Sequence, residues 1–79
     1  MKANVYVTLK REVLDPQGDA VRRALGALGF DGVKNVRVGK LIELEVDGDD
    51  EAAEGELEAM CQKLLANPVI EDFRYELVE

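Results

Sequence analysis

The apolar residues of this 79-residue chain follow a spacing that switches between two residues and three or four residues along the sequence. A spacing of two is typical of a strand, and a spacing of three or four is typical of an amphipathic helix. Residues 2–9 alternate strictly, with Ala3, Val5, Val7 and Leu9 on one side. This first segment is therefore predicted to be a half-buried strand.

The segment 16–28 is predicted to be a helix. Asp15 is a favourable N-cap residue, and Pro16 suits the first helical position. Gly29 suits the left-handed position that ends many helices. The apolar residues follow at helical spacing and form one stripe, which consists of Val21, Ala24, Leu25 and Leu28.

A second helix is predicted over residues 50–66, and a last strand over residues 70–78. Acidic residues crowd the start of this helix, where the helix dipole favours them. Pro68 prevents the helix from continuing. Its apolar stripe comprises Leu57, Met60, Cys61, Leu64 and Leu65, and the last strand alternates Phe73, Tyr75 and Leu77 with polar residues.

The segment between the helices, residues 33–47, allows two interpretations. A hairpin with the three-residue loop Gly39-Lys40-Leu41 pairs Val38 with Ile42 and keeps one face apolar. The same alternation also fits one long strand over residues 33–47, bent at Gly39. The hairpin is preferred because about fifteen residues exceed the usual strand length.

The expected order of elements is β-α-β-β-α-β in a single domain over residues 1–79. This order predicts an α+β, split βαββαβ (ferredoxin-like) fold, with an antiparallel sheet and both helices on one face. The alternative is a βαβαβ order with the long bent strand 33–47. The other sheet face is expected to be half apolar and open to another chain, and to include Tyr6, Tyr75 and Leu41 with Thr8, Arg37 and Arg74.

A chain this short has a marginal core of its own. One cysteine rules out an internal disulfide, and the absence of histidine argues against a structural zinc site. Self-association or a partner chain is the remaining way to stabilise such a domain. Association with a second copy or with a partner chain is therefore expected.

The formal net charge is −7, and it is unevenly distributed. Residues 1–39 carry seven Lys/Arg and four Asp/Glu, whereas residues 40–79 carry three and thirteen. An acidic chain of this kind is a poor nucleic-acid binder. No apolar run approaches the length of a membrane span, and the first residues do not resemble a signal peptide, so a cytoplasmic location is expected.

Catalytic motifs are missing from the sequence. Without histidine or serine, no Ser-His, Cys-His or His-metal site is possible. Cys61 lies in the apolar stripe of the second helix and is expected to be an inert, buried thiol. The acidic turn 47–51 lacks the glycine and the distal glutamate of a calcium loop. No catalytic, cofactor-binding or metal-binding residue is therefore predicted.

Five short strings give the chain a family resemblance. In order, they are VYVTLK (5–10), VLDPQG (13–18), VRVGK (36–40), MC (60–61) and LLANPVIED (64–72). Together, and at this spacing, they resemble the PurS family, the small subunit of phosphoribosylformylglycinamidine synthase (FGAM synthase). The resemblance extends from about residue 3 to residue 78.

The resemblance implies a role in purine biosynthesis. The complex converts formylglycinamide ribonucleotide (FGAR) to the amidine (FGAM) with ATP and glutamine. A large synthetase subunit, PurL, carries the ATP and Mg chemistry, and a glutaminase subunit, PurQ, releases ammonia. The small subunit is expected to have no chemistry of its own. It is expected to act as a homodimer or tetramer that bridges the other two subunits, while aiding assembly or ammonia transfer.

The same strings suggest residues that contact partner chains. The candidates are residues that strand or helix patterning does not require, although turn or cap chemistry also explains each: Arg37, Gly39, Lys40, Asn67 and Glu71, with Lys10 and Gln17 as further candidates. Two other functions stay open. One is a small-ligand-binding regulatory module of ferredoxin-like fold, and the other is a stand-alone acylphosphatase-like enzyme, although the loop at residues 10–12 lacks the glycines of an anion site.

Overall fold

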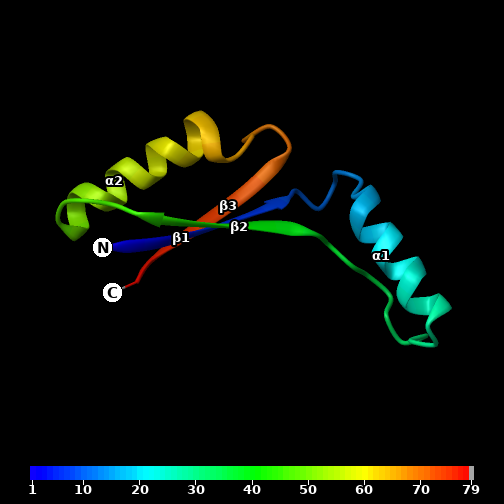
Figure 1. Ribbon diagram of the computed structural model, residues 1–79. Coiled ribbons are helices and arrows are strands. Elements are labelled where there is room, and N and C mark those ends of the chain that lie inside the picture. Colours follow the sequence, from blue (N-terminus) through cyan, green and yellow to red (C-terminus); the bar gives the residue numbers. More distant parts are fainter. Residues whose placement is uncertain (79) are drawn as a thin grey trace.

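A computed structural model describes residues 1–78 of the chain, which form an antiparallel sheet and two helices (Figure 1). The α+β class is thereby confirmed. The molecule is elongated, with principal extents of 48 × 27 × 14 Å. Its elements, in order, are β1 (Lys2–Leu9), α1 (Pro16–Ala27), β2 (Gly39–Glu45), α2 (Asp50–Met60), the π-helical turn η1 (Cys61–Leu65) and β3 (Glu71–Val78).

The sheet has the strand order β2-β1-β3, and both pairs are antiparallel. Val5 of β1 lies opposite Ile42 of β2 and Tyr75 of β3. Residues directly opposite one another share a face of the sheet, so these three point to the same side. The assignment of Tyr75 to the open face was therefore wrong, because its register places it with the core residues.

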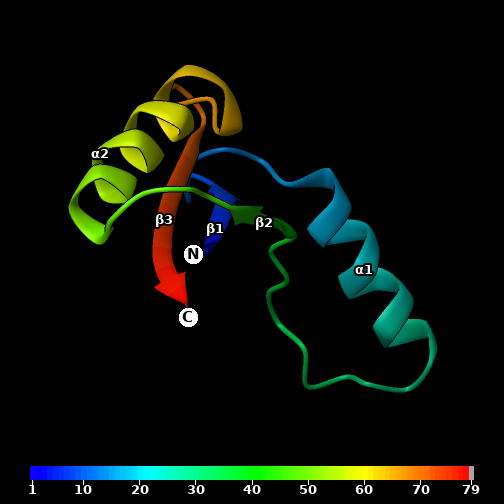
Figure 2. The same ribbon diagram turned by 60° about the vertical axis from the view of Figure 1, so that its left-hand side comes forward.

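The core lies between this inner face of the sheet and α2, which runs across it (Figure 2). Val5, Val7, Leu57 and Cys61 are completely buried. The predicted second helix is confirmed, although its last turn widens into η1, where the Ala66 N–H donates to the Cys61 carbonyl at 3.0 Å. Burial of Cys61, as expected, leaves its thiol without solvent access.

The predicted hairpin within residues 36–46 does not form. A single strand, β2, occupies this region, so the element order is that of the βαβαβ alternative, with a strand shorter than 33–47. Gly39 is not a turn residue. It pairs with Thr8, and a Cβ added there would lie 2.7 Å from the Val7 carbonyl oxygen. Alternation alone cannot separate one strand from two, because both keep the same face apolar.

Helix α1 does not lie beside α2 on the sheet, as the two-helix layer predicted. It extends from one end of the sheet (Figures 1 and 2), and no residue of α1 belongs to the core cluster of the described chain. Its predicted ends are confirmed: Asp15 is the N-cap, and Gly29 has φ 100°. Val21 and Leu28 nevertheless remain 42% and 74% exposed. We call this helix, with the connectors on either side of it, the arm.

Within residues 1–78, no helix combines the length and the apolar character that crossing a membrane requires.

Candidate interaction site

The five predicted contact residues lie at the end of the sheet from which the arm extends. Lys40 and Glu71 form an ion pair, with Nζ 3.7 Å from Oε2. The other carboxylate oxygen of Glu71 accepts the Asn67 N–H at 2.7 Å, and the Asn67 side-chain oxygen accepts the Val69 N–H at 3.1 Å. The structure thus brings Lys40, Asn67 and Glu71 into one cluster.

Arg37 stands apart from this cluster and binds backbone. Its Nη2 donates to the carbonyl oxygens of Lys10 at 2.8 Å and Val13 at 3.0 Å, with a longer contact to Leu9 at 3.4 Å. An arginine that caps several carbonyls fixes the chain that carries them. Arg37 therefore has a structural role, whatever it contacts outside the chain.

A cavity of about 350 Å³ lies between the ion pair and the start of the arm. The predicted candidates Gln17, Gly39, Lys40 and Glu71 line it, together with Asp15. Lys10 lies at the same end, and its N–H donates to the Ile70 carbonyl at 2.9 Å. Residues from four of the five strings singled out in the sequence therefore converge on one region.

Asp15 has a larger role here than the N-cap predicted for it. One carboxylate oxygen accepts the Gly18 N–H at 2.9 Å, and the other accepts the Val38 N–H at 2.8 Å. These two backbone donors, with a smaller contribution from the Arg37 charge, lower the pKa of the Asp15 carboxyl. The Asp-Pro string gave the cap, but nothing in the sequence indicated the second acceptor.

This pKa shift gives a pH dependence to stability. A carboxylate with a lowered folded pKa stabilises the fold above its unfolded pKa, near 3.9, and loses that contribution as pH falls through the folded pKa. When urea unfolding is measured from about pH 6 to about pH 2, the free energy of unfolding is expected to fall steeply below about pH 4. Asp15→Asn is expected to make that loss shallower, without abolishing it, because Asp19 and Glu76 also have lowered pKa values. An unchanged slope in the variant would contradict the assignment.

The outer face of the sheet carries a polar cluster around Tyr6. The Tyr6 hydroxyl donates to Glu76 at 2.7 Å, which raises the Tyr6 pKa and lowers the Glu76 pKa. The Arg74 guanidinium lies 3.9 Å from the Tyr6 ring centroid, in cation–π geometry. Tyr6, Arg74 and Leu41 thus share this face, as predicted.

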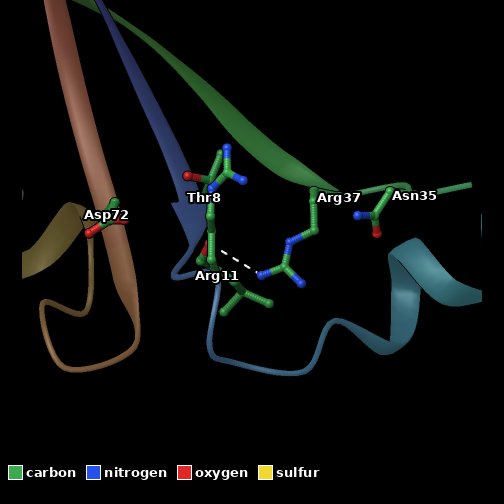
Figure 3. A pocket seen from close by; sticks show the side chains of 6 residues that line it. Thr8, Arg11, Asn35, Arg37 and Asp72 are labelled. Atoms are coloured by element: carbon green, nitrogen blue, oxygen red, sulfur yellow. Dashed lines mark hydrogen bonds between the residues drawn. The ribbon is translucent and has the colours of Figure 1, made fainter.

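A second, larger hollow of about 630 Å³ lies where this outer face meets the arm (Figure 3). Thr8 and Asp72 come from the sheet, whereas Asn35 and Arg37 come from the connector that follows α1. The dashed line in Figure 3 marks the hydrogen bond from Arg37 to the Leu9 carbonyl. The side chains that line this hollow include two arginines, an amide and a carboxylate. The hollow therefore suits groups of either charge.

An apolar groove of about 580 Å³ runs between β2 and the end of α2. Leu64 is 83% exposed there, and the charged residues Glu56 and Lys63 also line the groove. Leu64 belongs to the apolar stripe that the sequence predicted for the second helix. That stripe assumes α-helical spacing, whereas the chain widens into the π-helical turn η1 (Cys61–Leu65) at this point, which changes the direction of the Leu64 side chain. The apolar lining comprises Leu44, Ala59, Met60, Leu64 and Leu65.

The described residues contain no group of three or more His, Cys, Asp or Glu placed to hold a metal ion. Burial raises the pKa of the Cys61 thiol, and the nearby Glu58 charge raises it further. A raised pKa disfavours the thiolate, which is the reactive form of cysteine. Cys61 is therefore suited to packing and not to nucleophilic chemistry.

These features define a small α+β domain of ferredoxin-like type with an apolar groove and an amphipathic helix whose apolar residues Val21 and Leu28 are exposed. Exposed apolar surface of this kind is characteristic of domains that associate with other chains. The sequence model of the PurS family, described as phosphoribosylformylglycinamidine (FGAM) synthase, matches residues 2–79. The chain belongs to the PurS family, as its sequence strings suggested.

Relatives and solved structures agree with this assignment. The chain is 50% identical over 78 residues to "Phosphoribosylformylglycinamidine synthase subunit PurS" of Bacillus subtilis, covering 99% of this chain and 93% of the relative. The crystal structure of B. subtilis PurS matches with a TM-score of 0.89, covering 99% and 98% of the two chains. A chain in the structure of PurLQS from Thermotoga maritima matches with a TM-score of 0.89 at 33% identity, covering 98% and 95%.

Proposed function

We propose that this chain is a non-catalytic subunit of FGAM synthase that bridges the glutaminase PurQ and the synthetase PurL. The observation that carries the proposal is the full-length match to PurS, including a chain of the Thermotoga PurLQS structure at a TM-score of 0.89. In this role the chain aids assembly or the transfer of ammonia, in a cytoplasmic enzyme of purine biosynthesis. ATP and magnesium bind the large subunit in this proposal, and this chain binds neither.

Reconstitution tests the proposal. PurL and PurQ from the same organism are combined with and without this chain, and FGAM formation from FGAR and ATP is followed. Turnover with glutamine is expected to require the chain, because a bridge couples the two sites. Turnover with free ammonium is expected to be largely independent of it. Equal rates with and without the chain, for both nitrogen sources, would overturn the proposal and favour a ligand-binding module.

The polar cluster at the arm end of the sheet is proposed to contact the partner subunits. The Lys40–Glu71 pair suits a test, because the Lys40 side chain is 61% exposed and such pairs contribute little to folding. Lys40→Ala is expected to weaken binding to PurL or PurQ at least about tenfold, as charged interface contacts do, and to leave thermal unfolding unchanged. Lys34→Ala, an exposed lysine outside the cluster, is the control. Equal binding by both variants would remove Lys40 from the interface.

A homodimer is proposed as the basic unit of this subunit. Among residues 1–78, no core residue packs against the apolar stripe of α1, where Val21 and Leu28 are exposed, and the groove has an apolar lining in which Leu64 is 83% exposed. In a two-fold dimer, each α1 lies in the groove of the other copy. The apolar stripe and the groove are then covered in both chains. Arg23 on α1 is 69% exposed and pairs with Asp19, and both Glu56 and Lys63 line the groove, so oppositely charged groups are available on the two surfaces. A tetramer would pair two such dimers.

Leu64→Glu tests this dimer. A charge in an apolar interface is expected to raise the dimer dissociation constant at least about tenfold, a loss of about 1.4 kcal/mol or more. Sedimentation equilibrium gives the constant, and circular dichroism confirms that the helices persist. The control is Val69→Glu, at a residue that is 79% exposed and lies outside the groove. A wild-type constant for Leu64→Glu would exclude the groove from the interface.

A further inference from the structure

Within the arm, α1 joins the sheet through two connectors, residues 10–15 before the helix and residues 28–38 after it. The apolar residues of α1 do not pack on the core. The direction of the arm therefore depends on contacts at its root, the region where the two connectors meet the sheet. Arg37 makes one set of these contacts. It stands in the second connector and donates to the Lys10 and Val13 carbonyls of the first, at 2.8 and 3.0 Å.

Asp15 makes contacts in the opposite direction, from the first connector to the second. It stands in the first connector and accepts the Val38 N–H of the second at 2.8 Å, while it also caps α1 through the Gly18 N–H. The two side chains therefore cross, each reaching from its own connector to the backbone of the other. The arrangement is tight, because Asp15 is only 6% exposed and a Cβ at Gly18 would lie 2.1 Å from the Val36 carbonyl oxygen.

Comparison with the other N-cap in the chain separates capping from this second role. Asp49 caps α2 through the Ala52 N–H at 2.9 Å, with one oxygen and in an exposed position. Helix capping therefore needs one acceptor, and Asp15 provides two. The second oxygen of Asp15 serves the link between the connectors.

We propose that Asp15 and Arg37 are positioning residues that hold the arm in one direction, away from its own sheet, so that its apolar stripe reaches a second copy of the chain. This inference rests on the homodimer proposed above. Without the two links, the root is a flexible pair of connectors, and α1 samples directions that cannot enter the groove of the other copy.

The expected loss of dimer affinity follows from the fraction of chains whose arm points in the binding direction. Apparent affinity falls with the fraction of molecules in the binding-competent state, and a reciprocal dimer needs both arms to be competent. If each arm is competent for about one third of the time, the apparent dissociation constant rises about tenfold.

The test uses the double variant Asp15→Asn with Arg37→Gln. Asparagine keeps one oxygen for the Gly18 cap and replaces the other with an amide group that cannot accept from Val38. Glutamine is too short and has too few donors to span both carbonyls. The matched control is Asp49→Asn with Lys34→Gln, which makes the same Asp→Asn change at the other N-cap and removes one positive charge elsewhere in the second connector.

Arm direction is measured by pulsed electron paramagnetic resonance. Spin labels are placed on cysteines that replace the exposed residues Ala27 of α1 and Glu54 of α2, and labelled chains are diluted into unlabelled ones. The native Cys61 is fully buried and escapes labelling in the folded chain. The wild type and the control are expected to give one narrow distance distribution, and the double variant a broad one, with helix content unchanged. The chain is studied alone, so contacts of Arg37 with other subunits play no part.

Two readouts separate this inference from the dimer on which it rests. The dissociation constant of the double variant is expected to rise about tenfold, and that of the control to stay at the wild-type value. A wild-type chain that is monomeric at every concentration overturns the dimer, and the distance distributions still decide the positioning role. A narrow, unshifted distribution in the folded double variant overturns the positioning role, whether or not the chain dimerises.

Discussion

Leu57→Ala is expected to lower the free energy of unfolding by about 2–5 kcal/mol, the usual cost of removing a fully buried leucine side chain. Leu57 is 0% exposed, is the largest fully buried side chain among the described residues, and belongs to the core between α2 and the sheet. A domain of this size has a total stability of only about 4–12 kcal/mol, so the change removes a large share of it. Urea denaturation followed by circular dichroism measures the loss.

Leu14→Ala is the matched control for this prediction, because it makes the same change at a leucine that is 80% exposed. Its effect is expected to stay within about 0.5 kcal/mol. Similar losses in the two variants would mean that the contact between α2 and the sheet does not dominate the stability of the domain.

Gly18→Ala is expected to destabilise the chain by about 1–3 kcal/mol, the cost of overpacking. Glycine in a helix is normally less favourable than alanine, so the change would otherwise be stabilising. At this position, however, the added Cβ would meet the Val36 carbonyl oxygen at 2.1 Å and the Asp15 carboxylate at 2.8 Å. Both neighbours belong to the root of the arm and cannot move without opening it.

Gly26→Ala provides the opposite result within the same helix. A Cβ at Gly26 meets nothing within 4 Å. The helix propensity of alanine is therefore expected to raise the free energy of unfolding by about 0.5–1 kcal/mol, and the unfolding midpoint with it. Opposite signs for the two substitutions, measured by thermal unfolding at one protein concentration, are the expected outcome. A gain in both variants would contradict the close approach at Gly18.

The sequence was sufficient for the elements whose signals are local. The alternation of residues 2–9, the Asp15-Pro16 start of α1 and the Pro68 stop after the second helix each depend on a few neighbouring residues, and the structure confirms them. The PurS resemblance also depended on short strings, and the family match confirmed it. Local physics and local strings were thus read correctly.

Features that depend on tertiary contacts were missed. The hairpin was wrong because Gly39 reads as a turn residue, and its close approach to Val7 becomes visible only when β1 and β2 are paired. The predicted position of α1, beside α2 on the sheet, was wrong. An apolar stripe indicates that a helix is covered, without indicating which chain covers it. The contact candidates do gather at one end of the sheet, but Arg37 and Gly39 prove to have structural roles there as well.

The central position of β1 has a consequence for how the chain folds. Its two neighbours are β2 and β3, and the contact of Tyr6 with Glu76 joins residues 70 positions apart. Pairing across such separations requires closure of long loops, which slows folding relative to chains with local contacts. On the ribosome, β2 follows in the middle of the chain, but the edge of β1 that pairs with β3 stays open until almost the whole chain has been synthesised. Completion of the sheet is in this sense a late, post-synthetic event, in which a half-apolar strand with an open edge is the species that chaperones would have to protect.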